Sequence, residues 1–425
     1  MKILFLNTSQ HTGGAAIAAQ RLAEALRTEG VGVEVLTLED KDWEGSEGFE
    51  GSEGSEGLKR DRISRRRALW LKAWERFVIW CHAGFSRRNL WKVSLANTGV
   101  DVTETRAFKD ADIIHLHWVN QGFLSLAGIE RIVASGKPVV WTMHDMWPLT
   151  GICHHAHECR GYEEGCNSCP FLRGSLASKV FGQKAAIWQA RNLHFVGVSS
   201  WLRDKATSSK LMEGKEMAVI PNVISLEAFR RLDKVESRLA LGLPTQGNIL
   251  VMGAARIDDP IKGVDLLIAA LEKVATERVV PHLVLFGQIK SGAKALLSRI
   301  PVPCTYLGSI DGAEQLSRIY SAADVCVSSS LYETFGQTLV EAMACGCMPV
   351  SFDEGGQTDI IQHQQTGYLA RRRDTDDLAA GICWALDEGR YRITPEALRE
   401  HVCRRFAARV VARQYVDFYT KISKN

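Results

Sequence analysis

The chain has 425 residues, enough for two or three domains of ordinary size. Its formal net charge of +3 gives no global field that would favour nucleic acid, and no apolar run approaches the length of a membrane span. Its eleven cysteines are an odd and mostly scattered set, which fits a reducing cytosol better than a disulfide framework.

The N-terminal segment predicts a strand, a loop, a helix and a second strand. The first strand, over 2–6, is too short for the core of a signal peptide. Gly13 and Gly14 then precede an alanine-rich helix over 15–27, and the second strand follows at 33–38. Glycines at such a turn are typical of Rossmann-like domains, where the backbone approaches a ligand. Both are candidates for substrate binding, although the same pair also suits a turn that is only tight.

A low-complexity segment then interrupts the pattern. Residues 40–57 repeat Glu, Gly and Ser with almost nothing to bury, so we expect a disordered insert at about 40–60.

Residues 59–92 are strongly basic and rich in tryptophan. Trp70, Trp74 and Phe77 have the spacing of one helical face, and arginines such as Arg65, Arg66 and Arg67 flank them. A basic amphipathic helix rich in tryptophan can lie in a membrane interface or contact a lipid-linked acceptor. The alternative is a helix packed on the core with a solvated basic face. No RNA-binding motif accompanies the segment, so we expect no nucleic-acid partner.

A buried strand over 139–143 delivers His144 and Asp145 to its carboxyl end, the ligand-binding edge of a parallel sheet. His144 is a candidate catalytic residue and Asp145 a candidate substrate-binding residue. A role for His144 in loop structure remains open, and we expect packing or loop hydrogen bonding for His115 and His117.

A cysteine-rich insert over 150–172 follows this strand. Four cysteines fall within seventeen residues, close enough in sequence for a tetrahedral zinc site: Cys153, Cys159, Cys166 and Cys169. Structural zinc is one interpretation. Free buried thiols are another, and local disulfides do not suit a reducing cytosol.

The second half of the chain restarts the alternation of strands and helices. Arg256 and Lys262 bracket a loop at the end of a strand over 248–255, and two cations there can neutralise a diphosphate. Any charged, solvated loop would look similar. A further strand over 282–286 ends at Gly287, a glycine turn that we expect to approach a nucleotide.

The stretch from 323 to 352 predicts strand, loop, helix and strand. Glu333 lies in the loop, at the carboxyl end of the first strand, and Glu341 lies one to two turns into the helix. Backbone N–H groups at the helix start suit a phosphate. The substrate-binding candidates there are Phe335, Gly336, Gln337 and Thr338.

Glu333 to Gly346 resembles the E-x7-E element of retaining glycosyltransferase family 4. The arginine–lysine pair with Gly263 resembles that family's second signature, and the histidine–aspartate pair at 144–145 resembles its element near the acceptor and donor sugar. Pro221-Asn-Val resembles its interdomain linker. The resemblance covers nearly the whole chain, apart from the acidic repeat and the cysteine cluster.

The resemblance implies an α/β protein of the GT-B fold, with two Rossmann-like domains whose parallel sheets face a central cleft. The expected domains are 1–225 on the acceptor side and 230–400 for the nucleotide sugar, with a C-terminal helix in 401–425 crossing back to the first. We expect a boundary at 225–235, and we expect the segment 395–421 to be helical.

The implied activity is transfer of a sugar from a nucleoside-diphosphate sugar to a hydroxyl with retention of configuration and without a catalytic metal. Arg256, Lys262, Glu333 and His144 would be catalytic, and Glu341 would bind the ribose. The expected acceptor is a saccharide or lipid-linked saccharide in polysaccharide or lipopolysaccharide assembly. The expected location is the cytoplasm, or the inner face of the plasma membrane as a peripheral protein. Two alternatives remain: another GT-B enzyme, such as a nucleotide-sugar epimerase, and a non-catalytic binding or membrane-assembly protein.

Overall fold

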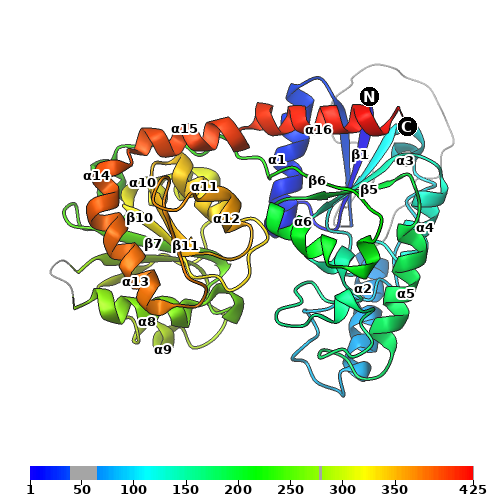
Figure 1. Ribbon diagram of the computed structural model, residues 1–425, viewed down its shortest axis with the longest axis horizontal. Coiled ribbons are helices and arrows are strands. Elements are labelled where there is room, and N and C mark those ends of the chain that lie inside the picture. The colour runs from blue at the N-terminus through cyan, green and yellow to red at the C-terminus, as the bar shows by residue number, and fades with distance from the viewer. Residues whose placement is uncertain (39–64, 277–279, 425) are drawn as a thin grey trace. The chain divides into compact units, whose positions relative to one another are not determined.

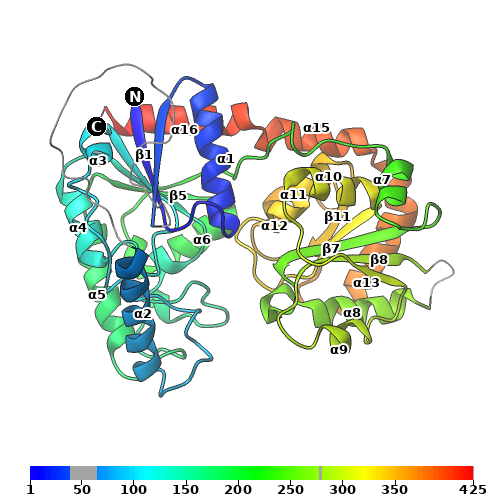
Figure 2. The same cartoon turned by 180° about the vertical axis from the view of Figure 1, so that it is seen from behind.

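The computed structural model describes residues 1–38, 65–276 and 280–424, so the expected insert at 40–60 lies outside the described residues. The chain divides into two compact units (Figures 1 and 2). The first comprises Met1–Val198, Leu202–Ile220 and Ala412–Asn425, and the second comprises Ser199–Trp201 and Pro221–Val411. The chain passes from the first unit to the second at Pro221, which lies before the domain boundary expected at 225–235.

The first unit is built on a parallel sheet with the strand order β2-β1-β3-β4-β5-β6. Its strands are β1 (Lys2–Asn7), β2 (Gly32–Thr37), β3 (Ile113–Leu116), β4 (Val139–Met143), β5 (Leu193–Gly197) and β6 (Met217–Val219). Its helices include α1 (Gly14–Thr28), α2 (Arg65–His82), α3 (Arg106–Asp110), α4 (Leu126–Ala134), α5 (Leu176–Trp188) and most of α6 (Ser200–Thr207). Short 3₁₀ turns are η1 (Trp147–Leu149), η2 (Gly161–Glu163) and η3 (Lys210–Met212).

The central strands of this sheet are buried on both faces. Every residue of β3 and of β4 is buried, as expected for parallel strands with helices on either side. Helix α1 buries five alanines together with Leu22 and Leu26. Because the alanine side chains are small, this helix packs closely.

The second unit has a parallel sheet of order β12-β11-β10-β7-β8-β9. Its strands are β7 (Ile249–Arg256), β8 (His282–Gln288), β9 (Cys304–Tyr306), β10 (Val325–Ser328), β11 (Met348–Phe352) and β12 (Tyr368–Ala370). Its helices are α7 (Lys234–Ala240), α8 (Val264–Val274), α9 (Ala293–Leu297), α10 (Ala313–Ala322), α11 (Gln337–Ala344), α12 (Gln357–Ile360), α13 (Thr375–Trp384), α14 (Arg390–Arg392) and α15 (Pro395–Phe406), with turns η4 (Pro260–Lys262) and η5 (Ala385–Gly389). In the described part of the chain, no helix is both long and apolar enough to cross a bilayer.

The C-terminal segment, which was expected to be helical over 395–421, consists of two helices rather than one continuous helix. The break lies at Ala407, whose φ of −60° and ψ of 147° are extended and therefore end α15. Helix α16 (Ala408–Ile422) begins directly after it. From Ala412 onward the chain belongs to the first unit, where the Tyr419 hydroxyl lies 2.7 Å from Nδ1 of His115.

Each sheet has a point where the chain reverses the direction in which strands are added. In the second unit β7 lies between β8 and β10, and the chain builds β8 and β9 on one side before returning to β10 on the other. In the first unit β1 lies between β2 and β3. Open parallel sheets bind ligands outside the carboxyl ends of the strands at such points. The loops after β7, β10, β1 and β3 are therefore the segments in which to look for a site.

Candidate active site

The loop after β7 and the loop after β10 are fastened together in the second unit. The Ser329 hydroxyl donates to the carbonyl oxygen of Lys262 over 3.0 Å, and the N–H of Leu331 donates to the carbonyl oxygen of Ile261 over 2.8 Å. Gly263 has a φ of +63°, and a Cβ atom there would lie 2.0 Å from the carbonyl oxygen of Ser329. Only glycine fits this approach, so Gly263 fixes how closely the two loops meet.

This contact brings two predicted residues together across 71 positions of sequence. The ammonium Nζ of Lys262 lies 2.8 Å from Oε2 of Glu333, and about a quarter of each side chain is exposed, 27% and 24%. The pair is therefore within reach of solvent and of a ligand. An anion that binds Lys262 would compete with Glu333 for the ammonium group.

Arg256, the other predicted cation, also has carboxylate neighbours. Its Nε donates to Oδ1 of Asp258 over 3.0 Å, and Nη2 lies 4.0 Å from Oδ2 of Asp259. The other oxygen of Asp258 accepts from the backbone N–H of Lys290 over 3.2 Å. Asp258 thus ties the end of β7 to the loop after β8, a role not predicted from sequence because Lys290 lies 32 positions further along the chain.

The segment after Glu333 leads into helix α11. Gly336 precedes the helix with a φ of +111° and, as a glycine, supplies no side-chain cap to the first turn. Uncapped N–H groups at a helix start are available to an anion. Phe335 is buried against Phe406, and Gln337 and Thr338 are partly exposed. The buried amide nitrogen of Gln337 has no hydrogen-bond partner among the described residues.

The backbone of Glu333 is held from a third loop, which the sequence analysis did not connect to it. The N–H of Gly356 donates to the carbonyl oxygen of Glu333 over 2.8 Å. A Cβ atom on Gly355 would lie 2.3 Å from that same oxygen, and one on Gly356 would lie 2.3 Å from the carbonyl oxygen of Thr334. The two glycines after β11 could have been suspected as close-approach positions from their sequence alone.

Two other predicted residues of this unit are enclosed. Glu341 is 6% exposed, and one carboxylate oxygen lies 3.5 Å from the hydroxyl of Tyr320. Gly287 has a φ of +125°, and a Cβ atom there would lie 1.8 Å from the carbonyl oxygen of Ala254. Close packing of the ends of β7 and β8 accounts for glycine at position 287.

In the first unit, Gly13 and Gly14 form the start of α1, and Gly13 has a φ of +96°. The preceding loop is joined to the loop after β3, because Thr8 donates its N–H to the carbonyl oxygen of Trp118 over 2.7 Å. The amide of Trp118 in turn donates to Oδ1 of Asn7 over 2.9 Å. The glycine turn therefore lies at the carboxyl edge, beside the point where the strand order reverses.

His144, directly after β4, is one of three stacked histidines. Its Nε2 lies 3.0 Å from Nδ1 of His117, and His117 stacks on His115 with ring centroids 4.2 Å apart. His115 is held by Tyr419 and by Thr142, whose Oγ1 lies 2.7 Å from Nε2 of the ring. The buried His115 and His117 have the packing and hydrogen-bonding role expected of them.

Burial decides the charge of this histidine stack. Burial lowers the pKa of His144 to about 4, against a smaller opposing effect of Asp145. Burial also lowers the pKa values of His115 and His117 well below the usual range, and neighbouring histidines add to the effect. All three rings are therefore neutral near pH 7, and His144 offers a hydrogen bond rather than a positive charge.

Asp145 is 8% exposed, and protein groups occupy both of its carboxylate oxygens. Oδ2 accepts from Nε1 of Trp118 at 2.8 Å and lies 2.6 Å from Nδ1 of His154, while Oδ1 accepts from the N–H of Trp147 at 2.8 Å. Burial would raise its pKa, but the His154 charge and hydrogen bond outweigh burial and lower it to about 2. Asp145 thus ties the cysteine-rich insert to the end of β4.

The four predicted cysteines line one cavity of that insert, together with residues such as Tyr162 and Phe171. Backbone N–H groups approach three of the sulfurs: Gly151 at 3.2 Å from Cys166 Sγ, Gly161 at 3.4 Å from Cys159 Sγ, and Phe171 and Leu172 at Cys169. All four are free thiols. Across the described ranges, however, no three His, Cys, Asp or Glu side chains are grouped so that they could hold a metal ion.

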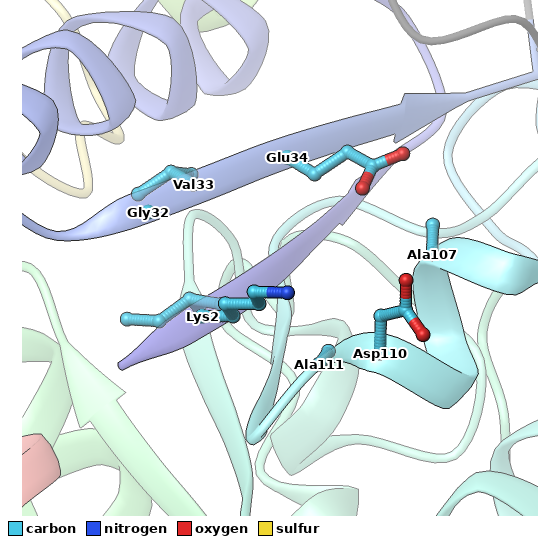
Figure 3. Close-up of a pocket in the computed structure, with 8 residues that line it drawn as sticks. Lys2, Gly32, Val33, Glu34, Ala107, Asp110 and Ala111 are labelled. Carbon is cyan, nitrogen blue, oxygen red and sulfur yellow. The ribbon is translucent and has the colours of Figure 1, made fainter. Parts of the chain in front are cut away.

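Another pocket lies at the opposite edge of the first sheet (Figure 3). It is formed by the amino end of β1, by β2 and by α3, and its charged side chains are Lys2, Glu34 and Asp110. Burial and Asp110 raise the pKa of Glu34. None of the predicted site residues lines this pocket, and the amino edge of a parallel sheet is not where ligands of such folds bind.

Two family models together match most of the chain. The model described as Glycosyltransferase Family 4 matches residues 12–228, about half of the chain, and the model described as Glycosyl transferases group 1 matches residues 246–388. The chain is 26% identical over 330 residues to a phosphatidyl-myo-inositol mannosyltransferase of Mycobacterium tuberculosis, covering 75% of each protein. It is 26% identical over 345 residues to a D-inositol 3-phosphate glycosyltransferase of Saccharomonospora viridis, covering 75% of this chain and 72% of that protein.

Solved structures agree with the fold expected from sequence. A sucrose-phosphate synthase from Thermosynechococcus elongatus superposes with a TM-score of 0.66 at 20% identity, covering 99% of each chain. Anabaena HepE in complex with UDP-glucose superposes with a TM-score of 0.60 at 16% identity, covering 99% of this chain and 100% of that one. Two six-stranded parallel sheets with these neighbours confirm the GT-B prediction. The chain is a glycosyltransferase and belongs to glycosyltransferase family 4.

Proposed function

We propose that this glycosyltransferase moves a sugar from a nucleoside-diphosphate sugar to a hydroxyl acceptor, with retention of configuration and without a catalytic metal. The observation that supports this most directly is the contact of Lys262 with Glu333 at the reversal point of the second sheet, beside the uncapped start of α11. The ammonium of Lys262 and the backbone N–H groups at the start of α11 are groups that bind phosphate. They lie at the carboxyl edge of the strands. The solved HepE complexes, which hold UDP and UDP-glucose on a similar fold, favour a nucleotide-sugar donor.

The proposed roles follow from which contacts a diphosphate would replace. The diphosphate takes the ammonium of Lys262 from Glu333 and the guanidinium of Arg256 from Asp258. Glu333 is then free to accept hydrogen bonds from hydroxyls of the donor sugar. As the bond between the sugar and the diphosphate breaks, negative charge grows on the leaving oxygen, and two fixed cations stabilise it. These cations do the work that a divalent ion does in other transferases.

The remaining predicted residues take supporting roles in the proposal. Glu341 accepts hydrogen bonds from the ribose through the small exposed part of its carboxylate. Neutral His144 gives a hydrogen bond to a sugar hydroxyl near the acceptor, and the backbone at Gly13 and Gly14 permits close approach of a ligand. Asp145 holds the start of the cysteine-rich insert, through Trp147 and His154, rather than binding substrate, because its own oxygens are occupied.

For the acceptor we propose a saccharide or lipid-linked saccharide in the assembly of cell-surface polysaccharide or lipopolysaccharide. A relative named phosphatidyl-myo-inositol mannosyltransferase supports a lipid-linked acceptor. The enzyme would work in the cytoplasm, as a peripheral protein at the inner face of the plasma membrane.

We also propose that the four cysteines of the insert bind one structural zinc ion, which requires the sulfurs to move closer together than they stand. Two features support a charged metal–thiolate group. Backbone N–H groups already point at three of the sulfurs. Buried Lys184, near Cys153 and Cys166, donates to the carbonyl oxygens of Trp147 and Thr150 over 2.7 and 2.9 Å rather than to a carboxylate. Burial lowers the pKa of Lys184, and thiolates on a metal would oppose that shift by favouring the ammonium form.

The test of the transferase proposal is product analysis with a panel of nucleoside-diphosphate sugars. A matching donor should raise the melting temperature, and NMR coupling constants should show the donor's anomeric configuration in the product. Activity should survive EDTA. An inverted product, or strict dependence on added magnesium or manganese, would contradict the proposal. Release of a free epimerised sugar nucleotide would instead favour an epimerase, and stabilisation without any product would favour a binding protein.

A further inference from the structure

Helix α2 is turned so that its aromatic side chains face outward. Trp70, Trp74 and Phe77 are 75%, 54% and 50% exposed. Phe85 and Trp91, in the segment after the helix, are 66% and 60% exposed. These five residues, here called the aromatic face, are all the exposed tryptophan and phenylalanine side chains in the described part of the chain.

The charged residues in the middle of α2 point the other way. Glu75 is fully buried and Arg76 is 8% exposed, and the two form an ion pair at 2.7 Å. The other carboxylate oxygen of Glu75 accepts from the N–H groups of Leu95 and Ala96 at 2.7 and 2.9 Å. An ordinary surface helix buries its apolar side and exposes its charges. In the middle of α2 the opposite holds, because Glu75 and Arg76 are buried and the aromatic side chains are exposed.

The buried pair also fixes the rotation of the helix. Arg76 donates to the carbonyl oxygens of Leu90 and Val93, the latter at 3.1 Å, so turning the aromatic face inward would leave a carboxylate and a guanidinium without partners. A second anchor is the hydroxyl of Thr98, which donates to the carbonyl oxygen of Leu71 over 3.0 Å. The outward position of the aromatic rings is thus built into the fold.

The aromatic face is continuous along the helix and into the following segment. Ring centroids of Trp74 and Phe77 lie 5.8 Å apart, those of Phe77 and Trp80 lie 6.2 Å apart, and those of Trp80 and Phe85 lie 4.9 Å apart. Trp80 also donates its indole N–H to the carbonyl oxygen of Phe85 over 2.8 Å. Figure 2 shows α2 at the lower end of the first unit, in the view of that figure.

Within the segment that carries the aromatic face, residues 67–92, the exposed charges have one sign. Between residues 67 and 92 the sequence has one acidic residue, Glu75, which is buried and paired. Exposed cations flank the face, namely Arg67, Arg87, Arg88 and Lys92. Lys72 and Arg76 also lie over the ring of Trp91, at 5.6 and 5.3 Å from its centroid. Exposed tryptophans beside the cations of the same segment match the chemistry of an anionic bilayer surface.

We propose that the aromatic face of α2 and its cationic border insert into the interface of a membrane that contains anionic lipid. The indole and phenyl rings enter the boundary between headgroups and acyl chains, and the four cations pair with lipid phosphates. Because the buried Glu75–Arg76 pair holds the face outward without lipid, binding needs no rearrangement of the helix. Lipid binding by this face does not require the transferase activity, so the two can be tested separately.

The test is co-sedimentation of the full chain, without nucleotide sugar, with vesicles of phosphatidylcholine containing phosphatidylglycerol or of phosphatidylcholine alone. We expect binding to the anionic vesicles at low salt and its loss in high salt. A triple variant Trp70→Ser, Trp74→Ser, Phe77→Ser should lower vesicle affinity by about tenfold or more. A triple variant Arg87→Gln, Arg88→Gln, Lys92→Gln should lower it by a similar factor on anionic vesicles only.

Matched controls separate this face from general surface effects. Tyr391→Ser removes an aromatic ring that is 77% exposed on the second unit and should leave vesicle binding unchanged. A variant with Lys210, Lys294 and Lys424 changed to Gln removes three exposed charges elsewhere and should have little effect. Because the altered side chains are exposed, the melting temperature of each variant should match that of the unaltered chain.

Three outcomes would overturn the proposal. One is failure of the unaltered chain to bind anionic vesicles at low salt. Another is full vesicle binding by the aromatic triple variant while its fold is intact. The third is a dimer in lipid-free sedimentation velocity that the aromatic substitutions dissociate, since the face would then be a contact between two copies of the chain.

Discussion

The ammonium of Lys262 and the carboxylate of Glu333 are 2.8 Å apart, although they lie 71 positions apart in the chain. The two loops that carry them are fastened by Gly263 and Ser329, so the ion pair is fixed by backbone geometry rather than by the side chains themselves. A pair that is about one-quarter exposed is weakly held, because water and salt screen it. An entering diphosphate therefore has little stabilisation to overcome when it takes the lysine.

Replacement of Lys262 by alanine should lower kcat by roughly a hundredfold or more, the scale for removal of one preorganised group that stabilises transition-state charge. The matched control is Lys273→Ala, which breaks the exposed surface pair of Lys273 with Asp376 on the same unit. Steady-state kinetics with a saturating donor should show the loss in the first variant alone. An equal loss in both variants would mean that surface charge, rather than the position of Lys262, sets the rate.

Replacement of Glu341 by alanine should mainly raise KM for the donor. The loss of binding free energy should be at most a few kcal/mol, the scale of one hydrogen bond to a charged group. Glu341→Gln keeps the volume of this 6% exposed side chain and isolates the effect of charge. Isothermal titration with the nucleoside diphosphate measures the change directly. If both variants bind the nucleotide normally and only lose thermal stability, the carboxylate contributes to the contact with Tyr320 and not to the ribose.

The stacked histidines should make stability depend on pH below neutrality. Burial lowers the pKa of His144 from 6.5 to about 4, so between these pH values the unfolded chain binds more protons than the folded one. The stability from this neutral ring is complete above pH 6.5 and is lost as the pH falls toward 4. His115 and His117 act in the same direction.

Calorimetric melting between pH 7 and 4.5 should therefore show a steep fall that His144→Gln makes shallower. His11→Gln, which changes an exposed histidine, serves as the control and should keep the slope of the unaltered chain. An unchanged slope in the His144 variant would place the pH dependence elsewhere. Asp145 does not dominate the measurement, because its folded-state pKa of about 2 and its usual value of 3.8 both lie below this window.

Protein purified without added zinc should contain about one zinc ion per chain, as a closed site of four thiolates requires. Cys159→Ser should reduce the metal content and lower the melting temperature, whereas Cys403→Ser, in the second unit, should change neither. Metal analysis and chelator-induced shifts of melting temperature provide the measurements. Metal-free protein with four thiols open to alkylation would leave the cysteines as packing residues of the insert.

The sequence by itself determined the two sheets and the loops that matter. Apolar runs such as those of β4 and β10 predict buried parallel strands because both faces of each strand must be covered. Such a run precedes each of the four predicted catalytic residues, Arg256, Lys262, Glu333 and His144. The order of segments along the chain is therefore enough to place them at or after strand ends. Helix α2 was also predictable, because the spacing of its tryptophans is local.

Only the tertiary structure decided which of these residues meet and which way they face. The contact of Lys262 with Glu333 depends on the adjacency of β7 and β10, which no local pattern records. Asp145 was predicted to bind substrate, but Trp118 and His154 reach its carboxylate from other segments and occupy it. The same holds for α2: periodicity gave its aromatic stripe, but the buried bonds of Glu75 and Arg76 to residues 90–96 turned that stripe outward. Side-chain orientation depends on partners distant in sequence, because a buried charge must find its hydrogen bonds wherever the fold supplies them.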